Sequence, residues 1–382
     1  MTDQASTGPW PATTELPRYA PLAHDVEADV CVVGAGIAGL TTAFLLAREG
    51  RRVVVLDDGP IGGGETGRTT AHLSPVLGTR YYELAQLHGE EGARTIASSH
   101  MAAVDFIEQT VAAERIACDF SRRDGWLFAP PDGPRDELER ELEAVHRAGI
   151  PGVELHASAP LSTISRGPAL RFPDQAQFHP LRYVSALARD LVARGGRIHC
   201  ATRAAAFEVG PLATVATEAG PKVSAPWLVV ATNSPVNDVV KMHTKLAPYR
   251  TYVVLLPVER DAVPRALFWD TADPYHYVRR LDVDSAEAGG HDLILVGGED
   301  HKTGQADDAD ARYARLEEWG RARFPVRGPR VRAWSGQVLE PMDGIAFVGR
   351  NPGAHDHVLI ATGDAGNGMT HGTIAGMLLA DL

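Results

Sequence analysis

Three glycines near the start of the chain have a spacing that could do chemistry. Gly34, Gly36 and Gly39 form a G-x-G-x-x-G pattern, and an acidic residue, Asp57, follows after a helix-length segment and an apolar run. Glycines at this spacing permit a tight turn, close approach of a pyrophosphate, and close packing of a helix on a strand. The first free N–H groups of that helix favour phosphate, and the acid is placed to accept hydrogen bonds from a ribose. The pattern predicts a βαβ unit that binds an adenosine diphosphate.

Two simpler interpretations of this stretch are weaker. A structural βαβ crossover without a ligand has no need of three glycines at this spacing. A membrane span is disfavoured because Gly34 and Gly36 interrupt the apolar run, and Asp29 and Arg48 bound a segment shorter than the ~20 residues a bilayer core requires.

A glycine-rich loop, residues 59–75, follows the acid directly. It contains five glycines together with Thr66, Thr69 and Thr70. Such a loop brings backbone close to a flat or phosphorylated ligand, although glycine-rich loops are also common as plain connectors. Arg68 could meet a phosphate. His72 could lie near a redox centre, while a lone histidine is more often simply a satisfied polar residue.

The C-terminal segment repeats this logic. An apolar strand is expected over residues 358–361, then a loop with Gly363, Gly366 and Gly368, then a helix that begins near Met369. The glycines allow close backbone approach, and the helix N–H groups could stabilise negative charge on a bound ring.

An aromatic strand is expected around PYHYVRR. A period of two places Tyr275, Tyr277 and Arg279 on one face of this strand. Two phenols beside a guanidinium could hold a carboxylate, and the alternative is a half-buried strand whose arginine points to solvent.

Composition limits the class of protein. The chain has 382 residues, 44% of them hydrophobic and 23% charged, which is typical of a globular protein large enough for two domains. A net charge of −12 disfavours a nucleic-acid surface. Three scattered cysteines, Cys31, Cys118 and Cys200, predict neither a disulfide framework nor a zinc site and fit a reducing cytoplasm. The first 25 residues are predicted to be an irregular arm rather than a signal peptide.

The remaining elements must position these groups. Residues 81–146 are mostly helical in pattern, with a break at 118–130 that predicts strands around a turn at Asp124-Gly125. A helix is expected after His179, ended by Gly195-Gly196, and a buried strand over residues 227–233. A further strand over 291–298 and a helix over 311–324 complete the pattern.

With both glycine loops in place, the chain resembles the D-amino-acid oxidase/glycine oxidase (DAO) superfamily of FAD-dependent oxidoreductases. The resemblance covers nearly the whole chain and rests on these stretches: DVCVVGAGIAGL with Asp57, GGGETGRTTAHL, FHPLRYVSALARDLVARGG, LVVATN, EPMDGIAFVGR and ATGDAGNGMTHGTIAGMLLADL. Within the superfamily it is most similar to bacterial members with a C-terminal Rieske iron–sulfur domain, which share wording like LFWDTADPYHYVRR, GGEDHKTGQ and WSGQVLEP. A Rieske centre needs paired Cys and His ligands, and this sequence contains no C-x-H or C-x-x-H. We therefore expect that either a Rieske domain follows in the natural protein or this member lacks it.

The resemblance implies an α/β fold: a Rossmann-like FAD-binding domain and a second domain built on an antiparallel sheet. The FAD-binding domain would comprise residues 26–85, 178–245 and 335–382, and the substrate domain residues 86–177 and 246–334. By the same resemblance, the cofactor residues would be Gly34, Gly36, Ile37, Ala38, Gly39, Asp57, Asp58, Gly64, Thr66, Arg68, Thr69, Thr70, Ala71, His72, Gly363, Gly366, Asn367, Gly368, Met369 and Thr370. The residues expected at the substrate are Tyr275, Tyr277, Arg279 and His72.

The implied chemistry is oxidation of a C–N bond of an amine or amino acid. A hydride would pass from the carbon bearing a neutral amine to flavin N5 and leave an imine, with oxygen or a redox protein as electron acceptor. Such hydride transfer requires no general base. One alternative is a 2-hydroxy-acid dehydrogenase, which would need a base, with His72, His276 and His301 as candidates. The other is a flavin module that relays electrons to an iron–sulfur partner.

Overall fold

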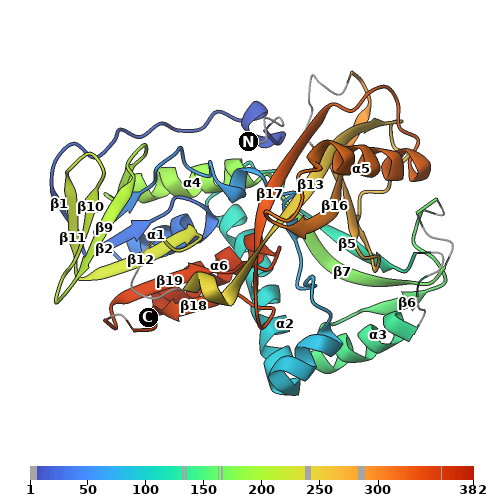
Figure 1. The fold of residues 1–382 in the computed structure, drawn as a ribbon, viewed down its shortest axis with the longest axis horizontal. Helices are drawn as coiled ribbons and strands as arrows, with labels where there is room; N and C mark the ends of the chain where they lie inside the picture. Colours follow the sequence, from blue (N-terminus) through green and yellow to red (C-terminus); the bar gives the residue numbers. More distant parts are fainter. Residues whose placement is uncertain are drawn as a thin grey trace.

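The structure is a computed structural model that describes residues 7–130, 133, 136–161, 163–164, 167–236, 242–282, 289–353 and 355–382. Two layered bodies lie side by side in Figure 1, one built on a mainly parallel sheet and the other on a large mixed sheet. This is an α/β fold in which the chain crosses repeatedly between the two bodies.

The first body is organised on a six-stranded sheet. Its order is β18 (Phe347–Arg350), β19 (Val358–Thr362), β12 (Trp227–Asn233), β2 (Val30–Val33), β3 (Val53–Leu56) and β8 (Arg197–His199). All neighbours are parallel except β18 and β19. β2 and β3 are buried at every residue, as apolar strands covered on both faces must be. The helices α1 (Ile37–Arg48), α4 (Pro180–Ala193) and α6 (Gly368–Asp381) belong to this body (Figure 1).

A small four-stranded sheet flanks the first body. Its strands are β1 (Val26–Glu27), β11 (Lys222–Ala225), β10 (Ala213–Thr217) and β9 (Ala204–Val209). The buried side chains of β10 and β11 pack with those of β2 and β3 in one apolar cluster. This sheet therefore covers one face of the parallel sheet.

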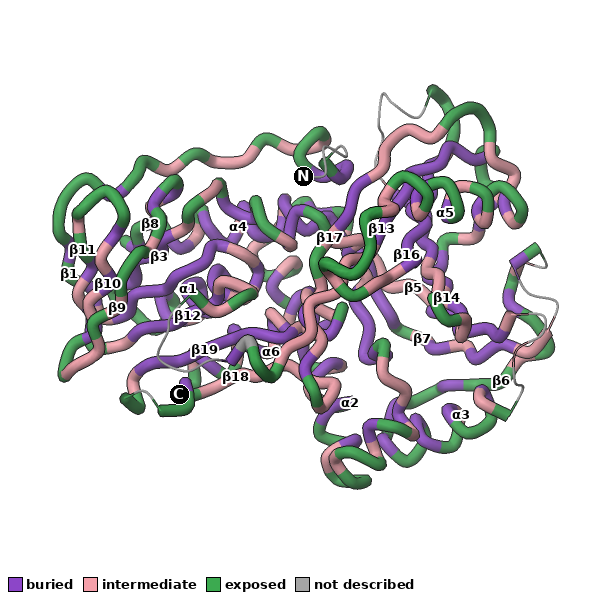
Figure 2. The backbone as a smooth tube through the Cα atoms, in the orientation of Figure 1, coloured by how far each residue is buried: buried purple, intermediate pink, exposed green. Residues whose placement is uncertain are grey.

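The second body is a nine-stranded sheet. Its order is β17 (Arg332–Pro341), β13 (Leu246–Val258), β16 (Asp292–Lys302), β15 (His276–Leu281), β14 (Leu267–Asp270), β5 (Ser121–Phe128), β7 (Ala169–Gln177) and β4 (His72–Leu73), with β6 (Glu154–His156) also paired to β7. All pairs are antiparallel except β14 with β5. The strands are largely buried in Figure 2, and α5 (Ala309–Arg323) packs on β13 and β16.

Two long helices and three short turns complete the chain. α2 (Tyr81–Ala113) is interrupted by non-helical backbone at Gly89, and α3 (Asp136–Ala148) packs against it. The 3-10 turns are η1 (Trp10–Ala12), η2 (Glu65–Gly67) and η3 (Met242–Lys245). Over the described residues, no helix is long and apolar enough to cross a membrane.

One local prediction was wrong. Residues 121–128 form a single strand with a register irregularity between Arg123 and Gly125, rather than two strands around a turn. A Cβ on Gly125 would lie 2.5 Å from the Trp269 ring. The glycine is therefore needed to admit the indole and not to make a turn.

Candidate functional site

A cavity of about 360 Å³ runs between the two bodies and collects most of the residues singled out by the sequence. Its lining comes from the first βαβ unit, the 64–70 loop, the end of β12, the C-terminal loop, and strands β13, β15 and β17. Segments far apart in the sequence therefore meet at the carboxyl ends of the parallel strands, where ligands bind in such sheets.

The N-terminus of α1 points its free backbone groups at this cavity. Gly36 is the N-cap residue and has no side-chain cap, while Thr66 Oγ1 accepts a hydrogen bond from Ile37 N–H at 3.1 Å. The other two glycines are fixed by packing: a Cβ on Gly34 would lie 2.3 Å from the Ala231 carbonyl oxygen, and one on Gly39 would lie 2.0 Å from the Gly34 carbonyl oxygen. An open helix N-terminus with close backbone approach fits a phosphate group.

Asp57 lies at the end of β3, on the cavity wall with Asp58. Its carboxylate accepts hydrogen bonds from the N–H groups of Ala35, at 2.6 Å, and Gly59, at 2.8 Å. Burial raises the pKa of this carboxyl, and the two hydrogen bonds oppose that rise. The side chain is thereby held in one orientation beside the glycine turn, where an adenosine ribose would lie.

Residues 68–71, at the end of the cavity-lining loop, accept hydrogen bonds from three buried side chains. The indole N–H of Trp10 donates to the Thr69 carbonyl at 2.7 Å, and that of Trp334 donates to the Arg68 carbonyl at 2.8 Å. Arg279 donates to the Ala71 carbonyl at 2.8 Å. These contacts occupy the carbonyls of Arg68, Thr69 and Ala71 with buried donors, which fixes the backbone next to the residues that line the cavity.

The C-terminal loop forms the opposite end of the cavity, through Gly363, Asp364, Gly366, Gly368 and Met369. Burial raises the pKa of the Asp364 carboxyl to about 6. Gly372, on the first turn of α6, allows close packing against α1, because a Cβ there would lie 2.6 Å from the Ile37 side chain.

A buried histidine pair ties α6 to α2. The Nε2 atoms of His100 and His371 lie 3.3 Å apart, and His371 Nδ1 lies 2.8 Å from the Asp364 carbonyl oxygen. The carbonyl can only accept, so His371 must donate from Nδ1 and accept at Nε2 when it is neutral. Burial lowers the pKa of both imidazoles, His371 to about 4. Both nitrogens of His371 are therefore engaged, Nδ1 with the C-terminal loop and Nε2 with His100 on α2.

The third wall comes from the large sheet. Tyr277 on β15 and Thr251 on β13 line the cavity, and their hydroxyl oxygens are 3.1 Å apart. The Tyr277 ring lies directly over Gly297 of the neighbouring strand, where a Cβ would come within 2.2 Å of it. Tyr275 is next to Tyr277, with ring centroids 5.6 Å apart, but its hydroxyl turns to Asp300 at 3.4 Å.

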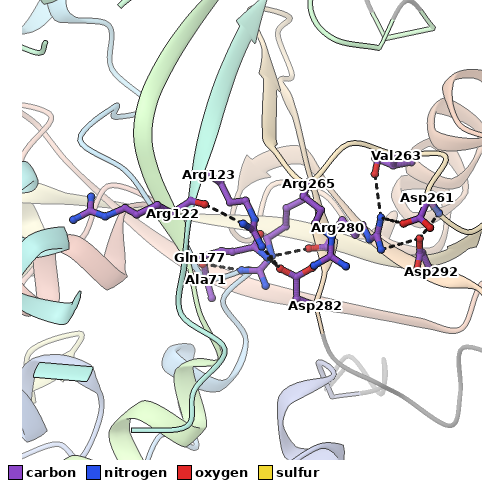
Figure 3. A network of polar contacts seen from close by, with 11 residues as sticks. Ala71, Arg122, Arg123, Gln177, Asp261, Val263, Arg265, Arg280, Asp282 and Asp292 are labelled. Carbon is purple, nitrogen blue, oxygen red and sulfur yellow. Dashed lines mark hydrogen bonds and ion pairs between the residues drawn. The ribbon is translucent and has the colours of Figure 1, made fainter. Parts of the chain in front are cut away.

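Arg279 shares the strand face predicted for it but does not line the cavity. Its side chain is only 2% exposed, and its guanidinium lies 5.4 Å from the Trp10 ring centroid. Figure 3 shows a polar network in which Arg123 and Arg265 converge on Asp282. The neighbouring Arg280 pairs with Asp261 and Asp292 in the same view. Arg279 therefore neither points to solvent nor lines the cavity.

Other predicted residues lie just behind the cavity wall. His72 Nδ1 is 3.1 Å from the Thr70 hydroxyl, and its ring packs edge-on against Tyr277. Asn367 donates to the Val76 carbonyl and Thr370 to the Asn367 carbonyl. Of the predicted residues, those lining the cavity are Gly34, Gly36, Ile37, Ala38, Asp57, Asp58, Gly64, Thr66, Arg68, Thr69, Thr70, Tyr277, Gly363, Gly366, Gly368 and Met369.

Several lining residues were not predicted. They include Glu65, Arg203, Asn233, Thr251, Gln337 and His371. Glu65 accepts the Gln337 backbone N–H at 2.8 Å, which joins the glycine loop to β17. Gln337 stands in WSGQVLEP, a stretch that carried the resemblance, so that signal could have found it.

Comparisons with known proteins agree with this geometry. The family model described as DAO, FAD dependent oxidoreductase, matches residues 29–382. The chain belongs to this family. FAD is therefore its cofactor, and the cleft between α1, the glycine loop and the C-terminal loop fits that group.

Relatives and solved structures extend the likeness. YhfW of Bacillus subtilis, whose name describes a Rieske 2Fe-2S iron–sulfur protein, is 30% identical over 98% of this chain and 72% of its own length. The gamma-glutamylputrescine oxidoreductase of Escherichia coli is 26% identical over 96% of this chain and 86% of its own length. Glycine oxidase from Geobacillus kaustophilus has the same fold, with a TM-score of 0.72, 17% identity and 94% coverage of both chains.

Proposed function

We propose that this FAD-dependent oxidoreductase oxidises the C–N bond of an amine or amino acid by hydride transfer to the flavin. Bound FAD would accept the hydride. The observation that carries the proposal is the wall opposite the cofactor loops, where two hydroxyls, on Tyr277 and Thr251, face the cavity. Hydroxyls can orient an amine nitrogen by hydrogen bonds, and a neutral amine needs no strong base in direct contact to lose a hydride.

The protein's own residues would bind and orient the two reactants. The N-terminus of α1 and Asp57 would hold the adenosine diphosphate, and Thr66, Arg68 and Thr70 would border the pyrophosphate and the ring. The C-terminal loop, from Gly363 to Met369, would lie along the pyrimidine edge. Names of relatives support this substrate class, since they include a gamma-glutamylputrescine oxidoreductase and a glycine oxidase.

The geometry disfavours a 2-hydroxy-acid dehydrogenase, which needs a base at the substrate hydroxyl. Among the described residues, none of the three candidate histidines lines the cavity. His276 pairs with Asp270 at 3.0 Å and stacks on Trp319, and His301 stacks on Tyr252. His371 does line it, but both of its nitrogens are engaged.

An electron relay to an iron–sulfur partner is the second candidate, favoured by the likeness to YhfW. Within the described residues, no group of three or more His, Cys, Asp or Glu side chains could hold a metal ion. Such a partner cluster would therefore have to lie outside these residues, and oxygen or a redox protein is the proposed acceptor.

The test is anaerobic titration of the yellow protein with glycine, L-proline, gamma-glutamylputrescine and L-lactate. Bleaching of the flavin by one of the amines, with no reduction by L-lactate, supports C–N oxidation. Reduction by L-lactate alone supports the hydroxy-acid reaction. If none reduces the flavin while an added iron–sulfur protein exchanges electrons with it, the relay is the better description.

A further inference from the structure

A chain of hydroxyls leads from the cavity to a buried carboxyl group. Tyr277 and Thr251 line the cavity, and behind them, on β16, lies Asp300. The Thr251 side chain hydrogen-bonds the Asp300 carboxyl, and the Tyr275 hydroxyl donates to Asp300 Oδ2 at 3.4 Å. β16 pairs with both β13 and β15, and Thr251 and Asp300 lie at a register irregularity of the β13–β16 pair, between Arg250↔His301 and Tyr252↔Gly298.

The direction of these hydrogen bonds follows from the single proton that each hydroxyl group carries. A carboxylate only accepts, so Thr251 must donate its single hydroxyl proton to Asp300. Thr251 can then only accept from Tyr277, whose hydroxyl lies 3.1 Å away, and Tyr277 must be the donor. The lone pairs of the Tyr277 oxygen are therefore left to face the cavity as acceptors. A group that donates an N–H, such as a protonated amine, is what this arrangement accepts.

Asp300 has unused capacity to take a proton. Its Oδ1 is buried and has no hydrogen-bond partner among the described residues. Burial raises the pKa of its carboxyl to about 6, against the opposing effect of the Thr251 and Tyr275 hydrogen bonds. It is thus ionised at neutral pH and can be protonated at moderate energetic cost.

The charged groups around Asp300 come from each packed element. Arg312 on α5 favours the ionised form, while Glu299 on its own strand and Glu340 on β17 disfavour it. Burial raises the pKa of Glu340 to about 7, so this neighbour is only partly ionised at neutral pH. His301, next in sequence, has its pKa lowered by burial.

We propose that Asp300 accepts the proton that a protonated amine substrate must lose, through Tyr277 and Thr251. The inference rests on the proposed function. The substrate nitrogen would give one proton to the Tyr277 oxygen, Tyr277 would pass its own proton to Thr251, and Thr251 would pass its proton to Asp300. The amine is left neutral with its lone pair free, which is the form from whose α-carbon bound FAD would accept a hydride carrying both electrons. Tyr277 would be the contact to substrate, and Thr251 and Asp300 act through it.

The hydrogen-bonded path from Tyr277 through Thr251 to Asp300 predicts how amine binding depends on pH. In the wild type, the protonated amine binds to protein in which Asp300 is ionised, and the transferred proton stays in the protein. The affinity for the amine should therefore not change with pH between about pH 7 and the pKa of the amine. Below about pH 6, affinity falls as Asp300 becomes protonated. In Asp300→Asn the amine must bind in its neutral form, so affinity should rise about tenfold per pH unit up to the pKa of the amine, with release of close to one proton per amine bound.

The experiment follows binding rather than turnover. The FAD-loaded protein is titrated with tert-butylamine, which has no hydrogen on its α-carbon, by the flavin difference spectrum between pH 6 and pH 10, with an indicator dye reporting proton release. In Asp300→Asn and Thr251→Val, the affinity for the amine should rise with pH, and binding should release a proton. Thr251→Ser should behave as wild type. Asp307→Asn, at an exposed position, is the matched control.

The outcomes separate the two proposals. If affinity depends on pH equally in wild type and Asp300→Asn, and both release the same number of protons, the proposed proton transfer to Asp300 is overturned. This holds even if glycine or L-proline reduces the flavin. If tert-butylamine does not perturb the flavin, the same pH series is run on the rate of flavin reduction by whichever amine bleaches it, with the same slopes expected. If no amine binds to the protein or reduces the flavin, both the proposed function and the proton transfer to Asp300 are overturned. If amine affinity rises with pH in Asp300→Asn and Thr251→Val but not in Thr251→Ser, the Thr251 hydroxyl connects Tyr277 to Asp300.

Discussion

Gly36 is the residue at which backbone and cofactor would come closest. It caps α1 without a side chain, and an added Cβ would already lie 3.1 Å from Thr66 Oγ1, inside the region where the pyrophosphate is proposed to lie. We predict that Gly36→Val folds but loses bound FAD, because the branched side chain occupies phosphate space. The measurement is flavin content per protein after gel filtration. Gly78→Val, at an exposed glycine with open space around it, is the control and should keep its flavin. A yellow, stoichiometric Gly36→Val protein would place the pyrophosphate elsewhere.

Arg279 offers a second prediction at the same scale. The sequence suggested a substrate anchor, and the geometry favours support of the cofactor loop through the Ala71 carbonyl. A buried charged hydrogen bond is worth about 1.5–3 kcal/mol, so Arg279→Met should lower the free energy of unfolding by about that amount. Urea denaturation of the FAD-bound protein measures it. Arg265→Met, at a half-exposed member of the same network, should cost less than about 1 kcal/mol.

The anchor hypothesis makes the opposite prediction for Arg279→Met. Stability would hardly change, and the rate of flavin reduction would fall only for substrates that carry a carboxylate. Comparing glycine with a simple amine in the same variant decides between the two roles.

Among the elements, the N-terminal arm contributes directly to the cofactor loop. Trp10 is fully buried, its N–H binds the Thr69 carbonyl, and nearby Thr13 contacts His179 at 3.0 Å. Trp10→Phe keeps most of the ring and removes one hydrogen bond worth about 1 kcal/mol. We expect FAD to bind about fivefold more weakly, measured by fluorescence titration of apoprotein. Trp227→Phe, in β12, is the control. Equal affinities in wild type and Trp10→Phe would show that the arm does not hold the loop in its binding geometry.

How far the sequence predicts the elements depends on whether the signal is local. The glycine turns at Gly34 and Gly363 could be predicted because each glycine pattern lies beside the strand and helix that it joins. Thr251 and Asp300 could not be predicted, because they meet where β13 and β16 pair with a register irregularity, and a sequence does not state which strands will pair or where the register shifts. Period two correctly placed Arg279 on the Tyr277 face, but it could not say where along that face the cavity ends.

At the scale of the whole molecule, buried neutral histidines contribute to the dependence of stability on pH. Burial lowers the pKa of His72 and His179 to about 3 and that of His371 to about 4. In the unfolded chain all three titrate near their ordinary pKa of about 6.5. At these three groups the unfolded state therefore binds more protons below that pH, so their contribution to stability, present above pH 6.5, is lost as pH falls toward 4. The carboxyls of Asp300, Asp364 and Glu340, whose pKa values are raised by burial, act in the opposite direction.

Urea midpoints at pH 7.5, 6 and 5 test this expectation. His179→Asn removes one of the three titrating groups, so its stability relative to the wild type should rise as pH falls over this range. A stability difference between variant and wild type that is the same at all three pH values would show that the His179 imidazole does not contribute.

The contact between α1 and α6 has a consequence for how the holoprotein is made. Gly372 and Gly376 let α6 lie directly on α1, where added Cβ atoms would come within 2.6 Å and 2.4 Å of Ile37 and Thr41. β19, which precedes α6, sits next to β12 and two places from β2. A nascent chain that has left the ribosome only as far as β17 thus has the first glycine turn but lacks the strand, loop and helix that close the cavity. We expect cofactor loading to follow synthesis of residues 358–381, which form that strand, loop and helix, and the flavin would join them to the first glycine turn.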